Sequence, residues 1–196
     1  VLEASVQVDL YDSDMPGFWR SGAALLPLPE AWLAEAPRLR LLAEAHIGAL
    51  AAQKEVHQGA LEEINAASAR FNAWVRQQAE IWLGRGKIVG LLGGDHSSPL
   101  GLMAALAARH PEGYGILQID AHADLRPAYE GFEFSHASIM YNALKLPQVG
   151  RLVQVGLRDM GANEAALAAG DPRIAQHTLR GLRRQAFGGA NWESLC

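Results

Sequence analysis

The pattern of apolar and polar positions along the chain changes near residue 86. Before that point, the apolar residues of 61–82 recur three or four positions apart, which predicts one long amphipathic helix that ends near Gly84 and Gly86. Pro37 predicts a break in the helical region before it, so that the better helix covers residues 38–53. Residues 5–10 alternate polar with apolar side chains, which is typical of a half-buried strand or an extended arm.

After residue 86 the pattern predicts a parallel sheet. We expect strands at 87–92, 114–119, 151–156 and 173–178, and helices at 100–109, 137–144, 163–169 and 179–187. Because the runs 88–92 and 152–155 are largely apolar, these strands are expected to be covered on both faces. We therefore predict a single α/β domain over residues 1–196, built as three α/β/α layers around a central parallel sheet, with ligands at the carboxyl ends of the strands.

Composition narrows the class of partner. The chain has 196 residues, of which 49% are hydrophobic and 19% charged, so a disordered chain is excluded. Its net charge of -4 argues against nucleic acid or an anionic membrane as a partner, and no apolar stretch reaches the ~20 residues of a membrane span. Its single cysteine, Cys196, predicts a reducing compartment and hence the cytoplasm.

The first group of chemically active residues lies at 93–99, in the sequence GGDHSSP, where a predicted strand ends and a helix begins. The glycines allow a tight turn, Ser98 is predicted to cap the helix and Pro99 to take its first position. His96 would then lie at the carboxyl end of a strand. The alternatives are a capped turn in which the histidine only forms hydrogen bonds, and a phosphate-binding loop, which the absence of a following lysine disfavours.

The second group is residues 120–124, DAHAD, directly after an apolar run. Alternate side chains of an extended chain share a face, so we expect Asp120, His122 and Asp124 to converge. Desolvated carboxylates repel one another, and a cation would stabilise them. Oxygen and imidazole ligands without thiolate favour Mn(II) and leave Zn, Fe(II) and Ni open. With His96, these residues suit two metal ions that share a carboxylate. The alternative to a metal site is a strand end whose charged side chains are solvated.

The remaining histidines lack partners at the spacing of metal ligands. We interpret them as surface or helix-cap residues: His46, His57, His110 and His177.

The segments GGDHS at 93–97 and DAHAD at 120–124 resemble, in order and spacing, the first two metal motifs of the ureohydrolase family, which contains arginases, agmatinases, guanidinobutyrases and formimidoylglutamases. Residues 133–137, EFSHA, resemble the agmatinase type, and 153–158, VQVGLR, are similar to a strand of the family. The resemblance covers residues 65–159. It implies the α/β/α fold of arginases and deacetylases, of which this chain would form a part.

The resemblance also implies a set of residue roles. Two Mn(II) ions per complete chain would be bound by His96 on one ion and His122 on the other, with Asp120 bridging them and Asp124 on the ion of His96. No other cofactor is expected. A hydroxide held between the ions would attack the substrate, Asp124 would accept its hydrogen bond, and His136 would pass a proton to the departing amine. The alternative for His136 is an ordinary residue at a helix start.

The implied reaction is hydrolysis of a guanidino or amidine carbon–nitrogen bond in a small amine, which releases urea or an analogous amide. Agmatine-like substrates rank before arginine and formimidoylglutamate, and the resemblance implies a homo-oligomer, a trimer or hexamer. The family's Ser-x-Asp-x-Asp segment and a later glutamate are missing, and no Asp-x-Asp occurs after residue 159.

We therefore expect the middle of a longer ureohydrolase, inactive as the chain stands. The alternative is a non-catalytic metal-binding or scaffold relative. Deacetylases of the same general fold are disfavoured, because the adjacent histidines expected of them do not occur.

Overall fold

The computed structural model describes residues 3, 7–191 and 193, so Cys196, on which the prediction of a reducing compartment depends, lies outside the described residues. The chain divides into two compact units, Val1–Leu41 and Leu42–Cys196. The first contains a short 3-10 helix and the start of a helix that crosses the boundary: η1 (Phe18–Ser21) and α2 (Glu30–Ala51). The single domain over 1–196 stays a prediction.

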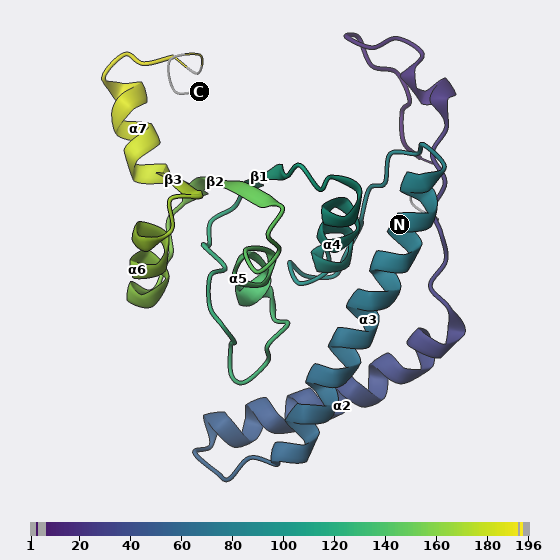
Figure 1. The fold of residues 1–196 in the computed structure, drawn as a ribbon, viewed down its shortest axis with the longest axis vertical. Coiled ribbons are helices and arrows are strands. Elements are labelled where there is room, and N and C mark those ends of the chain that lie inside the picture. Colours follow the sequence, from purple (N-terminus) through teal and green to yellow (C-terminus); the bar gives the residue numbers. More distant parts are fainter. Residues whose placement is uncertain (1–2, 4–6, 192, 194–196) are drawn as a thin grey trace. The chain divides into compact units, whose positions relative to one another are not determined.

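The second unit holds the remaining elements (Figure 1). In chain order they are α3 (Gln58–Gly84), α4 (Leu100–Arg109), β1 (Tyr114–Ile119), η2 (His136–Ser138), α5 (Ile139–Ala143), β2 (Val149–Leu157), α6 (Ala162–Gly170), β3 (Ile174–Thr178) and α7 (Leu179–Phe187).

Of the two alternatives for residues 5–10, the strand is wrong for residues 7–10, which form no strand, and the extended arm stays a prediction; residues 5 and 6 lie outside the described part of the chain. The predicted break at Pro37 is wrong. Helix α2 runs through Pro37 without a break. Proline removes only one backbone hydrogen bond from this helix of 22 residues, and the alanine, leucine, glutamate and arginine residues on both sides are strong helix formers.

Helix α3 confirms the long predicted helix and contacts α4 closely. It begins after His57, whose Nδ1 accepts a hydrogen bond from the Ala60 N–H at 3.2 Å, so His57 caps the helix, which is one of the two roles predicted for it. Gly101 of α4 faces α3: a Cβ atom there would lie 2.4 Å from the carbonyl oxygen of Asn72. Only glycine allows the two helices to approach this closely.

The sheet has three parallel strands in the order β1-β2-β3, which confirms three of the four predicted strands. Figure 1 shows α5 and α6 on one side of the sheet and α7 on the other, so the three α/β/α layers are present around a partial sheet. The register pairs Ile116 with Leu152 and Leu152 with Ile174. At Gly156, with φ of 94°, the ladder between β2 and β3 shifts.

The predicted strand at 87–92 is wrong, and so is the expectation that both faces of the sheet are covered. Residues 87–92 belong to no helix or strand and pair with no strand in the described chain. An apolar run becomes a strand of a sheet only where a neighbouring strand offers N–H and C=O groups to its backbone. Ile88 is fully exposed, and on β1 the outward-facing Leu117 and Ile119 are 66% and 79% exposed.

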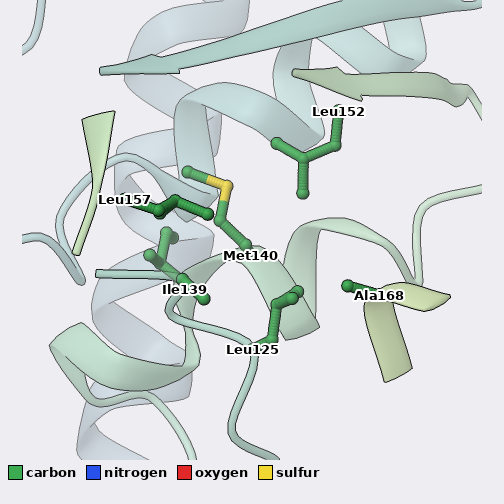
Figure 2. Close-up of a cluster of buried hydrophobic side chains, with 7 residues drawn as sticks. Leu125, Ile139, Met140, Leu152, Leu157 and Ala168 are labelled. Atoms are coloured by element: carbon green, nitrogen blue, oxygen red, sulfur yellow. The ribbon is translucent and has the colours of Figure 1, made fainter. Parts of the chain in front are cut away.

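The core lies on the side of the sheet that α5 and α6 cover. Figure 2 shows its central side chains, which come from the segment after β1, from β2 and from both helices. They are Ala123, Leu125, Ile139, Met140, Leu152, Leu157 and Ala168. Burial of Ala123 and Leu125 in this cluster anchors the segment that follows β1 and carries Asp124.

Among the described residues, no helix combines the length and the apolar character that crossing a bilayer requires.

Candidate metal centre

The loop that carries His96 is a tight turn closed by its own side chains. The Asp95 carboxylate accepts hydrogen bonds from the N–H and hydroxyl groups of Ser97, and the Ser98 hydroxyl donates to the Asp95 carbonyl at 2.9 Å. A Cβ on Gly93 would lie 2.2 Å from the Ser98 hydroxyl oxygen, so the turn requires glycine there. The predicted cap at Ser98 is wrong, because its hydroxyl is used within the turn and α4 begins after Pro99 without a side-chain cap.

Three predicted ligands converge at the carboxyl end of β1. The Nδ1 atom of His96 lies 2.6 Å from Asp124 Oδ2 and 3.0 Å from Asp120 Oδ2. One potential ligand atom from each of the three residues falls within 4.8 Å of the others. Asp124 is buried, whereas His96 and Asp120 are partly exposed, so the cluster opens to solvent on one side.

Asp124 reaches this cluster through an unusual backbone conformation. Its φ of 55° lies in the left-handed region, which aspartate tolerates better than most residues. Its carbonyl oxygen accepts hydrogen bonds from the N–H groups of Met140 and Tyr141 at the start of α5, at 3.1 and 3.2 Å. The chain therefore turns at Asp124, and the simple alternation expected for an extended segment does not describe residues 120–124.

His122 stands at the edge of this cluster. Its side chain is 60% exposed, and its Nδ1 lies 3.4 Å from Asp120 Oδ1, the carboxylate oxygen that faces away from His96. Its backbone forms an isolated parallel bridge with Asp159, which continues the pairing of β1 with β2. The two histidines thus lie against different oxygens of one carboxylate.

The assignment of His96, Asp120, His122 and Asp124 as metal ligands stays a prediction.

Hydrogen bonds and neighbouring charges shift the pKa values of His96 and Asp120 toward their charged forms. The hydrogen bond to Asp124 raises the pKa of His96 above its usual value, against the lowering effect of burial. Burial alone would raise the pKa of Asp120, but the hydrogen bonds from the His122 N–H and the Gln118 amide, with the charge of His96, bring it below its usual value. The Asp120 carboxylate is therefore held in its ionised form, which is the form that binds a cation.

Two glutamines touch this site and were missed by the sequence reasoning. The Gln118 amide nitrogen lies 3.4 Å from Asp120 Oδ2 and 3.2 Å from Asp124 Oδ2, and Gln154 donates to the Ala123 carbonyl oxygen at 2.7 Å. The sequence signal that could have found them is a glutamine within each of two largely apolar predicted strands, at 114–119 and 151–156.

His136 lies just before α5, the helix whose N–H groups bind the Asp124 carbonyl oxygen. It begins η2, and the carbonyl of the next residue, Ala137, accepts the Arg126 N–H at 3.0 Å. The ring of Tyr129 meets the His136 ring edge-on with centroids 5.7 Å apart. A 3-10 turn followed by the short helix α5 replaces the single helix predicted at 137–144. The catalytic roles of His136 and Asp124 stay predictions.

The loop before His136 is held by a histidine that the sequence reasoning placed wrongly on the surface. His46 is buried at 5% exposure, and its Nε2 donates to the Glu130 carbonyl at 2.8 Å. Asn65 of α3 holds the same loop, because it donates to the Gly131 carbonyl and accepts the Glu133 N–H. His177 is exposed, and the partly exposed His110 lies at the C-cap position of α4, as expected.

A model of the Arginase family matches residues 20–190 of this chain. The match covers most of the sequence, and the chain belongs to the arginase family.

The curated protein N(1)-aminopropylagmatine ureohydrolase of Thermus thermophilus is 42% identical over 97 residues, which are 48% of this chain and 31% of that protein. Among solved structures, the arginase from Medicago truncatula aligns with a TM-score of 0.56 and 28% identity, over 64% of this chain and 40% of that one. The agmatine ureohydrolase of Thermoplasma volcanium aligns with a TM-score of 0.51 and 25% identity, over 62% and 40%. The chain spans less than half the length of each of these relatives.

The residues present fit a hard divalent cation. One imidazole nitrogen and two carboxylate oxygens form the cluster, and no thiolate lies within it. Such a donor set suits Mn(II) better than metals that prefer sulfur. His96, Asp120 and Asp124 would hold one ion, and His122 with the far oxygen of Asp120 would contribute to a second.

Proposed function

We propose that this chain carries part of the binuclear manganese centre of an enzyme that hydrolyses the carbon–nitrogen bond of a guanidino or amidine group. The supporting observation is that one potential ligand atom from each of His96, Asp120 and Asp124 lies within 4.8 Å of the others at the end of β1. The proposed substrates are agmatine-like amines first, then arginine and formimidoylglutamate, and the products are urea or an analogous amide. Two similar proteins are named ureohydrolases of agmatine or an aminopropyl derivative of it.

Each residue has a proposed part in the reaction. Mn(II) held by these residues would lower the pKa of water and so would supply a nucleophile near neutral pH. Asp120 lies between the two histidines, so one oxygen faces each proposed ion position. Asp124, buried and fixed by its backbone bonds to α5, accepts the hydrogen bond that orients the attacking group. His136 gives a proton to the departing amine.

The test uses the complete natural protein, freed of metal and reloaded with Mn(II) chloride. Urea release is measured with agmatine, arginine and 4-guanidinobutyrate, and ammonia or formamide release with formimidoylglutamate. The proposal expects Mn-dependent hydrolysis with the highest kcat/KM for agmatine. Asp124→Asn, which keeps the size of the side chain and removes its charge, is expected to abolish hydrolysis, and Asp159→Asn, a carboxylate outside the cluster, is expected to retain it.

A non-catalytic metal-binding relative is the second candidate, favoured by the lack of an Asp-x-Asp segment after residue 159. The same experiment separates the two. Mn(II) binding without hydrolysis of any of the four substrates supports the second candidate, and Mn-dependent hydrolysis of one of them excludes it.

The assembly and the cellular compartment belong to the same proposal. We place the protein in the cytoplasm as a homo-oligomer, a trimer or a hexamer, with a small guanidino compound as its partner. Light scattering coupled to gel filtration of the complete protein measures the assembly, and a monomer would contradict this part of the proposal.

A further inference from the structure

Three glutamines form a row across the sheet that ends on Asp120 and Asp124, two of the proposed metal ligands. Gln118 of β1 is in register with Gln154 of β2, which is in register with Gln176 of β3. Gln176 donates to Gln154 Oε1 at 2.7 Å, Gln154 donates to Gln118 Oε1, and Gln118 donates to Asp120 and Asp124. We call these three residues the glutamine row.

Backbone carbonyls fix the direction of the glutamine row. Gln154 Nε2 lies 2.7 Å from the Ala123 carbonyl oxygen, and Gln118 Nε2 lies 3.2 Å from the His122 carbonyl oxygen. A carbonyl oxygen only accepts, so each of these amides must present its NH₂ group to the 120–124 segment. Every amide in the row therefore donates toward the carboxylates, and the positive ends of the amide dipoles point at them.

Two of the three amides are buried, so their hydrogen bonds must be satisfied within the protein. Gln154 has no exposed surface and Gln118 is 4% exposed, whereas the apolar neighbours of Gln118, Leu117 and Ile119, face outward and are largely exposed. Burying an amide costs free energy unless its hydrogen bonds are satisfied, and an aliphatic side chain would pack in this core without that requirement. The network is satisfied at both glutamines, and its donors are directed at the predicted ligands.

We propose that Gln118, held by Gln154 and Gln176, is a positioning residue that orients Asp120 and Asp124 toward the metal ions. This inference rests on the proposed function, since it assumes that Asp120 and Asp124 bind Mn(II). Gln118 contacts the oxygens of both carboxylates that face His96, and Gln154 fixes the backbone between them at Ala123. Together they set the separation of the two carboxylates before metal arrives, which lowers the cost of ordering the ligands on binding.

The experiment measures Mn(II) affinity and thermal stability of the metal-free complete protein with Gln118→Met, Gln154→Met and Gln176→Met. Methionine keeps the length and volume of the side chain and removes the amide. The matched control is Gln148→Met, which lies next to the amino end of β2, away from the cluster. Titration with Mn(II) chloride followed by EPR gives the dissociation constant, and the EPR spectrum of the bound ion reports its ligand set.

The proposal expects Gln118→Met to weaken Mn(II) binding by about 10- to 100-fold and to change the spectrum of the bound ion. The loss should decrease in the order Gln118, Gln154, Gln176, although Gln154 is the most buried. A purely structural role predicts the opposite: melting temperatures fall most for Gln154→Met, while affinity and spectrum stay unchanged.

The outcomes separate the two hypotheses. Tight Mn(II) binding by wild type with unchanged affinity and spectrum in Gln118→Met overturns the positioning role alone. No Mn(II) binding by wild type overturns the proposed function itself. If Gln118→Met does not fold, the more exposed Gln176→Met decides: weaker binding than in Gln148→Met supports the positioning role, and equal binding overturns it.

Discussion

Single residues at the end of β1 determine how the predicted ligands are oriented. Asp124 has a left-handed backbone, so its carbonyl caps the start of α5 while its carboxylate turns back toward His96. Asp120 lies 3.0 and 3.4 Å from the nitrogens of His96 and His122 through different oxygens. This geometry separates the proposed ligands of two ions, and it makes the contribution of each histidine testable.

Substituting His122→Ala in the complete protein is expected to lower bound Mn(II) from about two ions to about one per chain. His122 faces the outer oxygen of Asp120, and His96 with both aspartates would keep the other ion. Metal analysis after gel filtration measures the stoichiometry, with the exposed His177→Ala as the control. Equal metal content in wild type and His122→Ala would contradict the assignment of His122.

Substituting His136→Ala is expected to leave Mn(II) bound and to reduce turnover by about 10²- to 10⁴-fold, the usual effect of removing a general acid or base. His136 lies outside the ligand cluster, next to the backbone that pairs with Arg126. Steady-state kinetics and metal analysis of the same preparation test this, with His110→Ala as the control. Near-normal turnover would leave His136 as an ordinary residue of a helix start.

Among the elements, the contact between α3 and α4 tolerates no added atom at Gly101. A Cβ atom would meet the backbone of α3, with the Asn72 oxygen at 2.4 Å and the Arg76 nitrogen at 2.8 Å. We expect Gly101→Ala to lower the free energy of unfolding by about 3 kcal/mol, because rigid backbone has to move. Urea denaturation measures this. The control, Gly48→Ala in α2, has open space and should stabilise by up to ~1 kcal/mol, and equal stability of the two variants would contradict the close contact.

The start of β3 is tied to neighbouring segments by Arg173. Its guanidinium donates to both oxygens of Asp171 and to the carbonyls of Leu144 and Val149. The hydrogen bond and charge of Arg173 hold the pKa of Asp171 below its usual value. A lowered pKa in the folded state means that this carboxylate stabilises the fold above about pH 4, and that the stabilisation is lost as the pH falls through the lowered pKa.

Replacing Arg173 by Met is therefore expected to lower the free energy of unfolding by about 1 kcal/mol at pH 7. The effect is this small because Arg173 and Asp171 are both partly exposed and solvent screens their attraction. The difference between wild type and Arg173→Met should shrink as the pH drops from 5 to 2. Urea denaturation across this pH range measures it, with the exposed Arg180→Met as the control. A difference that is constant with pH would show that Asp171 is not stabilised by Arg173.

At the scale of the whole molecule, the sheet presents one apolar face to solvent. Leu117 and Ile119 of β1 are 66% and 79% exposed, and the unpaired backbone edge of a strand adds to the tendency to associate. The double variant Leu117→Thr/Ile119→Thr is expected to reduce light scattering of the 196-residue chain without a change in its circular dichroism. The control Leu25→Thr/Leu28→Thr lies in a loop of the other unit, and equal scattering by the two variants would contradict a role for this face.

The sequence by itself determined the elements whose pattern is local. Helical spacing located α3 and α4, and apolar runs between turn residues located β1 and β2, because these periods depend only on neighbouring positions. The two motifs at 93–97 and 120–124 predicted the cluster of His96, Asp120 and Asp124 for a related reason: glycine turns and paired carboxylates at a strand end have few structural uses.

Only the tertiary structure decided which of the remaining residues meet. The glutamine row exists because three strands pair in one register, and no pattern within a single strand shows which residues its neighbours place beside it. Residues 87–92 read as a strand but have no ladder partner among the described residues. His46 is buried because a loop 84 positions further along the chain offers its carbonyl. In each case, a contact between distant segments decides what the local sequence leaves open.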